Sequence, residues 1–352
     1  MGIVIPLSVP SRIAPLPERI SALVGLFATE RRVEDDVFWL KENAELLNIL
    51  ECTGQVVDPA ALAVHEGFYQ RAEERLRFFP QYYRFLLSLV LDLEALGMPG
   101  DAAQRMVDFA QKQGLAGAEL SDLQRAEARR LMARRGVDPL RDAGLDDRLR
   151  AFAGRTATFA LPNKKAAYEL THIVYYLGEY GRRDPNLPQP AIESLHYAAL
   201  TAFIEQNADL LAEICIALIH AGQAVPALWT QWLGAQTRAF VTETGEGVPL
   251  SDDYHEFLVC NWHAACADAP LFRLALDVQP TRFERGPRGT PLREVSMALL
   301  DLEGGRSGDW TQMRRRLAPM LTEDTLDILD TAAMSSPHFE TYFQGFARAG
   351  AA

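Results

Sequence analysis

The sequence of 352 residues contains only four cysteines, and no two of them form a CxxC pair: Cys52, Cys215, Cys260 and Cys266. A disulfide framework or a thiolate zinc site needs closer or more numerous cysteines, so neither is expected. All but Cys266 lie among apolar residues with helical spacing. The simplest interpretation is free, buried thiols in a reducing compartment.

Long apolar runs are also missing. The longest candidate, Phe85 to Leu91, ends at Asp92, whereas a membrane-spanning helix needs about 20 apolar residues. Near the start of the sequence four prolines interrupt the apolar residues and no basic segment precedes them, so no secretory signal is predicted. We therefore expect a cytoplasmic protein without a membrane partner.

Positive charge is in the minority, since the formal net charge is -12. A nucleic acid partner is not expected, because neutralising phosphates requires a basic surface. The strongest local exception is the segment 125–135, which holds five arginines among its eleven residues. On a helix these arginines would spread around the axis, and we interpret them as a solvated face rather than a phosphate-binding patch.

Strand-like alternation is hard to find, whereas apolar residues recur at spacings of three and four along nearly the whole chain. This period is typical of amphipathic helices, so the sequence predicts an all-α protein. We expect about fifteen helices, at about residues 17–31, 34–52, 59–78, 81–97, 100–113, 119–135, 145–153, 163–182, 189–222, 225–241, 251–267, 291–303, 308–318, 322–333 and 336–348. Residues typical of helix starts precede several of them: Asp35, Asp58, Ser121, Asn163, Ser251 and Thr322. Glycines typical of helix ends follow others: Gly54, Gly97, Gly114, Gly136, Gly181 and Gly222.

Short loops between helices imply antiparallel neighbours, which favours an α/α toroid-like arrangement or an orthogonal bundle over a single-layer solenoid. We expect residues 1–352 to form one large helical domain, with the loop 278–291 as the best place for a subdivision. Four arginines in and beside this loop fit either a solvated loop or an anion-binding segment: Arg282, Arg285, Arg288 and Arg293.

Two carboxylate–imidazole pairs with a spacing of three residues are the most informative feature. Glu169 precedes His172, and Asp252 precedes His255, so each pair shares a helix face. Bundles that hold two metal ions use two such pairs and two further glutamates, for which Glu127 and Glu213 are the candidates. A first-turn position for Asp252 and arginines beside Glu127 weaken this dinuclear hypothesis.

A mononuclear site or an acid–base pair needs fewer residues. His172 and His255 would be the ligands or acid–base groups, with Glu169, Asp253 and Glu179 as carboxylate partners. Tyr176 is a candidate hydroxyl donor in the same pocket, and His263 either extends the site or belongs to a packed helix. The alternative is that these tyrosines and histidines only pack against one another in the core.

The segment Asp252–Glu256 resembles the acidic diphosphate–metal motif of the class I terpene synthases, which are also all-helical. That family carries its acidic motif in the first half of the chain and a second metal motif later, and this sequence matches neither placement. The resemblance implies diphosphate chemistry as an outside alternative. Motifs of other enzyme classes, including GxSxG, the Walker loop and HExxH, are absent.

Four segments together are similar to an uncharacterised bacterial domain of unknown function of the marine alphaproteobacterial type: Asp36–Asn48, Phe79–Arg84, Ala160–His172 and Asp253–His255. The similarity covers most of the chain. It implies a bacterial cytoplasmic protein and draws attention to His172 and His255, but it implies no reaction.

Two hypotheses of function follow. In the first, the protein has an internal His/carboxylate pocket with His172, His255, Glu169 and Asp253 as metal ligands, and is a metal-assisted enzyme that acts on a small molecule. A shared divalent ion would bring the two histidines within about 6 Å of one another. In the second, the protein is a noncatalytic helical scaffold or partner-binding protein, and the histidines are separate core residues. The sequence alone determines neither substrate nor oligomeric state.

Overall fold

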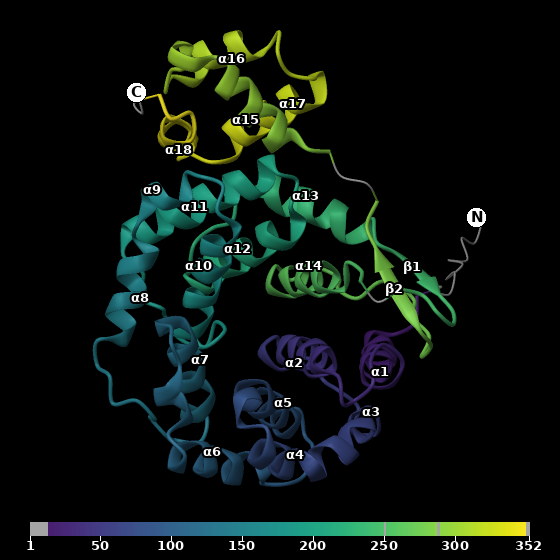
Figure 1. Cartoon of the computed structure of the whole chain (residues 1–352). Helices are drawn as coiled ribbons and strands as arrows, with labels where there is room; N and C mark the ends of the chain where they lie inside the picture. Colours follow the sequence, from purple (N-terminus) through teal and green to yellow (C-terminus); the bar gives the residue numbers. More distant parts are fainter. Residues whose placement is uncertain (1–12, 250, 287–288, 350–352) are drawn as a thin grey trace, which may run out of the picture.

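The computed structural model describes residues 13–249, 251–286 and 289–349, and these are mostly helical (Figure 1). The helices are α1 (Leu16–Gly25), α2 (Val37–Cys52), α3 (Pro59–Leu62), α4 (Glu66–Phe78), α5 (Tyr83–Ala95), α6 (Ala102–Lys112), α7 (Asp122–Ala133), α8 (Leu145–Ala153), α9 (Thr156–Phe159), α10 (Lys164–Leu177), α11 (Gln189–Ile204), α12 (Ala208–His220), α13 (Ala227–Arg238), α14 (Tyr254–Cys266), α15 (Pro291–Asp301), α16 (Trp310–Leu317), α17 (Glu323–Ser335) and α18 (Phe339–Phe346). The prediction of an all-α protein is confirmed.

Local capping explains several helix boundaries. Asp58, Ser121, Asn163 and Thr322 each accept a hydrogen bond from a backbone N–H in the first turn of the helix that they precede. The N-cap of α2 is Asp36 rather than Asp35, and Ser251 does not cap α14. All six glycines predicted to end helices have positive φ, a conformation that costs glycine little.

The central feature of the fold is a closed ring of helices, which Figure 1 shows from one end. Helices α2, α5, α7, α10, α12 and α14 pack on one another in this order, and α14 returns to pack on α2. Other helices form an outer layer, with α4 and α6 against α5, α8 against α7 and α10, and α11 and α13 against α12. Of the two arrangements predicted, the fold is therefore the α/α toroid-like one rather than the orthogonal bundle.

The ring helices run in the same direction, as contacts between their ends show. At one end, His255 in the first turn of α14 contacts Asp209 in the first turn of α12. At the other end, Arg134, just after α7, pairs with Asp92 near the end of α5. We call these the N-terminal and C-terminal ends of the ring.

The closure between α14 and α2 is held by Arg31, whose side chain is fully buried. Its guanidinium donates to Glu42 on α2 at 2.8 Å and to Asp252, just before α14, at 2.8 and 3.0 Å. The Phe27, Tyr254 and Phe283 rings surround it within 5.3 Å. This network fixes the start of α14, and therefore the position of His255, relative to α2.

The expectation of one helix over 189–222 is wrong, because α11 and α12 are separate and antiparallel neighbours in the ring wall. Gln206 turns the chain with φ of 58°, and Asn207 caps α12 by accepting from the backbone N–H of Leu210. No glycine or proline marks this turn, so the apolar period continues through it. The turn places Asp209 at the N-terminal end of the ring.

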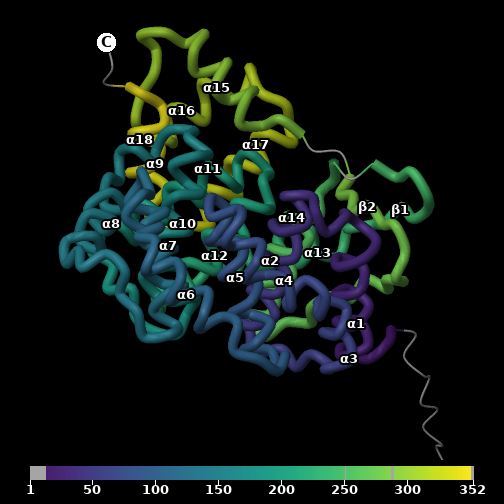
Figure 2. Tube along the Cα trace, turned by 60° about the horizontal axis from the view of Figure 1, so that its bottom comes forward, coloured from purple at the N-terminus to yellow at the C-terminus, as the bar shows by residue number. Residues whose placement is uncertain are grey.

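Two short strands were not predicted. β1 (Val241–Thr244) and β2 (Thr281–Glu284) pair antiparallel, with Val241 opposite Glu284 and Thr244 opposite Thr281. Four residues are too few to produce a clear alternation of apolar and polar residues. Beyond β2, helices α15, α17 and α18 lie against α11, α17 also lies against α13, and α16 packs on α15 and α18 (Figure 2). The subdivision expected at 278–291 stays a prediction.

None of the helices in the described ranges combines the length and the apolar composition that crossing a membrane requires.

Candidate functional site

Three side chains from two ring helices meet at the N-terminal end of the ring. Asp209 and Glu213 lie one turn apart on α12, and His255 is the second residue of α14. One ligand atom from each of the three lies within 4.8 Å of the others. The shortest contact is 2.7 Å, between Nδ1 of His255 and Oδ1 of Asp209. Carboxylate and imidazole groups at such distances form a ligand set that suits zinc and other transition metals.

Charged neighbours control the protonation of His255. Burial lowers the pKa of His255, but the carboxylates of Glu45 and Asp209 outweigh this effect and raise the pKa from 6.5 to about 10. Oε1 of Glu45, which belongs to α2, lies 3.8 Å from Nε2 of His255. At neutral pH the imidazole is therefore charged, and its Nδ1–H donates to Asp209.

Glu213 is the most buried member of the group, with an exposed fraction of 3%. Burial raises the pKa of its carboxyl group. The hydroxyl of Thr171 donates to Oε2 of Glu213 at 2.6 Å, and Nδ1 of His172 lies 4.0 Å from the same oxygen. A second histidine thus approaches the cluster from α10.

The tautomer of neutral His172 follows from one hydrogen bond. Nδ1 lies 2.7 Å from the backbone carbonyl oxygen of Tyr168. Because a carbonyl oxygen only accepts, Nδ1 carries the hydrogen, and Nε2 keeps its lone pair. Histidines that bind metals are commonly held by a carbonyl in this way.

Two tyrosine hydroxyls orient the carboxylates. Tyr168 donates to Oδ2 of Asp209 at 2.5 Å, and Tyr254 donates to Oε2 of Glu45 at 3.1 Å. These bonds hold the oxygen atoms on the far side of each carboxylate from His255. The cluster is therefore a connected polar network that spans α2, α10, α12 and α14.

The structure brings some of the predicted site residues together and places others elsewhere. His172 and His255 both lie near Glu213, as the hypothesis of a shared site requires. Asp253 accepts instead from the backbone N–H of Arg285 at 3.0 Å. Tyr176 is buried, with its ring centre 5.8 Å from that of His172. The catalytic and ligand roles assigned to these residues stay predictions.

Two other predicted carboxylates also lie on or just after α10. Glu169 is half-buried and has no ion pair among the described residues. Glu179, just beyond the end of α10, pairs with Arg183 at 3.3 Å.

The dinuclear hypothesis loses two of its residues to ion pairs. Asp252 is bound by Arg31, and Glu127 is bound by Arg84. Glu213 alone of the two extra glutamates joins the cluster. The acidic residues of the segment that resembles the terpene synthase motif also form ion pairs. Asp252 is buried against Arg31, and Glu256 is buried against Arg285.

The arginine-rich segments are also largely paired. In segment 125–135, Arg130 is buried with its guanidinium 4.5 Å from the Tyr180 ring centre, and Arg134 pairs with Asp92, so this helix face is not simply solvated. In the loop, Arg282 pairs with Glu284 and Arg285 with Glu256. Arg293 lines a surface cavity beside Lys164, and Arg288 lies outside the described residues.

Sequence reasoning missed Asp209 entirely and left open whether Glu45 lines a pocket or belongs to a polar core. The available signal was the spacing of four between Asp209 and Glu213, which puts both on one helix face. An acid near a helix start is ordinarily explained by the helix dipole, and the unrecognised turn at Gln206 hid the start itself.

A comparison with family models matches residues 1–349 to a domain of unknown function (DUF6902). No curated protein matches the chain, and no solved structure matches it.

Proposed function

This chain belongs to the family of the domain of unknown function DUF6902, and from its own residues we propose that it binds a divalent transition-metal ion through Asp209, Glu213 and His255. The observation that carries the proposal is the convergence of these three ligand atoms within 4.8 Å. Two further groups, His172 and Glu45, stand within 4.0 Å of this set.

The distances suit a metal ion. Ligand atoms about 2.0–2.2 Å from a tetrahedral zinc ion lie about 3–3.5 Å from one another. The contacts here range from 2.7 Å between His255 and Asp209 up to 4.8 Å across the cluster. Side-chain rotations that lengthen the contact between His255 and Asp209 and shorten the others would bring the three atoms to these separations.

The charges support the same conclusion. Three carboxylates, those of Glu45, Asp209 and Glu213, face one imidazolium, that of His255. A divalent ion would reduce this excess of negative charge, and it would take the place of the His255 proton that now joins the imidazole to Asp209. The Tyr168 carbonyl accepts the Nδ1 hydrogen of His172, so the other ring nitrogen, Nε2, is free to accept a proton beside the cluster.

The side chains around the centre are partly accessible to solvent. The side chains of His172 and His255 are 36% and 32% exposed, and those of Glu45 and Asp209 are 25% and 16% exposed. A metal ion with few protein ligands polarises a bound water or carbonyl oxygen. We propose that the protein uses such an ion to act on a small polar molecule that reaches the N-terminal end of the ring.

Calorimetric titration of metal-free protein with zinc and manganese tests the proposal. The parent should bind one ion, and the His255→Gln and Glu213→Gln variants should bind at least about tenfold more weakly, since each loses a direct ligand. Asp253→Asn is the matched control, because its oxygen is engaged by the Arg285 backbone, and it should bind like the parent. Absence of binding by folded parent protein would favour the noncatalytic scaffold instead.

A further inference from the structure

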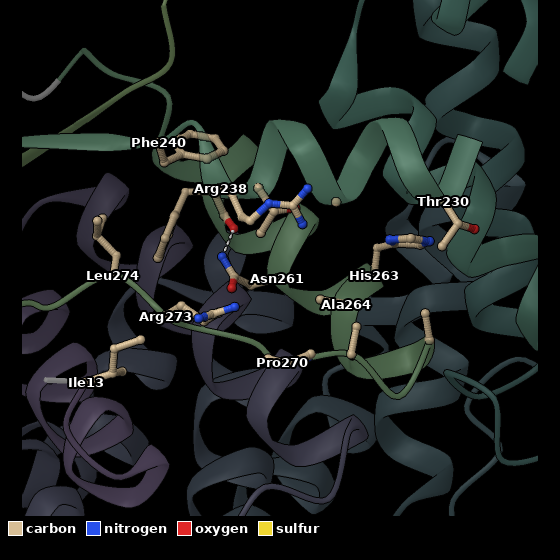
Figure 3. A pocket seen from close by; sticks show the side chains of 15 residues that line it. Ile13, Thr230, Arg238, Phe240, Asn261, His263, Ala264, Pro270, Arg273 and Leu274 are labelled. Carbon is tan, nitrogen blue, oxygen red and sulfur yellow. Dashed lines mark hydrogen bonds between the residues drawn. The ribbon is translucent and has the colours of Figure 1, made fainter. Parts of the chain in front are cut away.

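A second site lies on the other side of α14, between this helix, α13 and the segment 267–274 (Figure 3). The cavity has a volume of about 380 Å³, within the usual range for small-molecule sites. Its walls are largely apolar and include Phe240, Phe257, Ala264 and Leu274. None of the residues that line it belongs to the proposed metal centre.

The charge of this cavity is opposite to that of the protein. Its lining residues include Arg238 and Arg273 but no aspartate or glutamate, although the chain as a whole has a net charge of -12. In Figure 3 the two guanidinium groups lie on either side of Asn261. Arg19 adds a third cation nearby: burial and the charge of Arg273 both lower the pKa of Arg19.

Both lining arginines lack a partner within the part of the chain that the structure describes. Neither has a hydrogen bond or an ion pair there, whereas arginines such as Arg31, Arg84 and Arg148 are paired with carboxylates. A guanidinium is well suited to bind a carboxylate or phosphate through two parallel hydrogen bonds. Two such groups over one cavity therefore point to an anion.

A buried polar atom gives independent support. His263 lines the cavity with only 3% of its surface exposed, and its Nε2 has no hydrogen-bond partner. Burial lowers the pKa of His263 to about 4, so the ring is neutral. An unsatisfied buried nitrogen costs stability, and a rotation of the ring toward the cavity would let a polar group of a bound ligand satisfy it.

The wall that carries Arg273 is held in place from two sides. The amide oxygen of Asn261 accepts from the backbone N–H of Phe272 at 2.5 Å, and Arg19 donates to the carbonyl oxygen of Leu271 at 2.8 Å. Phe272 itself has φ of 47°, which is strained for a bulky residue. Such strain persists where the surroundings impose it, and it is common at binding sites.

We propose that this cavity binds a small organic anion, with its carboxylate or phosphate between Arg238 and Arg273 and its apolar body against Phe240, Phe257 and Leu274. A rotation of the His263 ring toward the cavity lets a polar atom on the ligand body complete its hydrogen bonding. The cavity is a preformed binding site, separate from the metal centre although both are built on α14.

Calorimetric titration with octanoate and octyl phosphate tests this site, and the two probes distinguish the carboxylate from the phosphate. Octylamine and octan-1-ol carry the same apolar chain without negative charge, and inorganic phosphate carries the charge without the chain. The parent should bind at least one of the two anionic probes with a stoichiometry of one. The three other compounds should bind at least about tenfold more weakly, since each lacks one of the two interactions.

The Arg238→Gln/Arg273→Gln double variant should bind the anionic probe at least about tenfold more weakly than the parent. The control is Arg141→Gln/Arg315→Gln, which removes the same charge from two exposed arginines outside the cavity. It should bind like the parent, and all four arginines are exposed enough for both variants to fold, which their melting temperatures will show. Equal binding by both double variants, equal binding of octan-1-ol and octanoate, or no saturable binding of either anionic probe would overturn the proposal.

Discussion

His255 and Asp209 are joined by a hydrogen bond of 2.7 Å, although 46 residues separate them in the sequence. The bond links the first turns of α14 and α12 at the N-terminal end of the ring. Because three carboxylates surround it, the imidazole remains charged and holds a proton where we propose a metal ion. This proton makes the metal centre testable through its pH dependence.

Metal affinity should rise with pH. The pKa of His255 is about 10 in the metal-free protein, so binding at neutral pH must displace one proton. The logarithm of the association constant should therefore increase by about one for each pH unit across the neutral range. Zinc titrations at several pH values, each in two buffers of different ionisation enthalpy, measure both the slope and the number of protons released. An affinity independent of pH would exclude His255 as the displaced group.

The stability of the metal-free protein should depend on the same proton. The folded-state pKa of His255 is raised from 6.5 to about 10, so its contribution to stability is complete below the unfolded value and is lost as the pH rises through the folded value. Between about pH 7 and pH 10 the free energy of unfolding of the parent should fall about 1–2 kcal/mol more than that of His255→Gln, after allowance for solvent screening. Urea denaturation measures this difference, and comparison of the two proteins cancels all other titrating groups. Parallel pH curves would contradict the assigned pKa.

Tyr168→Phe should weaken metal binding without removing a ligand. The Tyr168 hydroxyl donates to Oδ2 of Asp209 at 2.5 Å and so orients this carboxylate. Loss of such an orienting bond typically reduces metal affinity about 10- to 100-fold. Competition with a zinc chelator measures the change. Tyr197→Phe serves as the control, because Tyr197 packs on Tyr342, away from the cluster. If both variants bound metal like the parent, Asp209 would not be a ligand.

Arg31→Met should destabilise the fold strongly. The substitution leaves Asp252 buried without its cation and Glu42 with Arg32 alone, and breaking such a buried network typically costs about 3–5 kcal/mol. Arg71→Met removes an exposed pair with Glu34 and should cost less than about 1 kcal/mol. Denaturant unfolding of both variants gives the comparison. Similar small losses in the two variants would show that Arg31 does not hold the closure between α14 and α2.

The helical class and most helix boundaries followed from local signals. Apolar spacing and capping residues such as Asp58 and Asn163 act within one or two turns, so they are visible in the sequence. The turn at Gln206 was missed because no proline or glycine accompanies it, and the strands were missed because each spans only four residues.

The candidate site was only partly visible for a different reason. His172 and His255 attracted attention through their residue type, and the structure places both near Glu213. Their carboxylate partners, however, are set by tertiary contacts. Asp253, two residues before His255 in the sequence, is bound by the Arg285 backbone, whereas the distant Asp209 takes the position beside the imidazole. Spacing along one helix does not reveal which acid another helix will supply.

The most direct test of the metal centre is anomalous diffraction from crystals loaded with zinc, with data collected on both sides of the zinc absorption edge. The account predicts one strong anomalous peak at about 2.0–2.3 Å from a carboxylate oxygen of Asp209, one of Glu213 and a ring nitrogen of His255. A peak at other residues, or none at this end of the ring in fully loaded crystals, would contradict it.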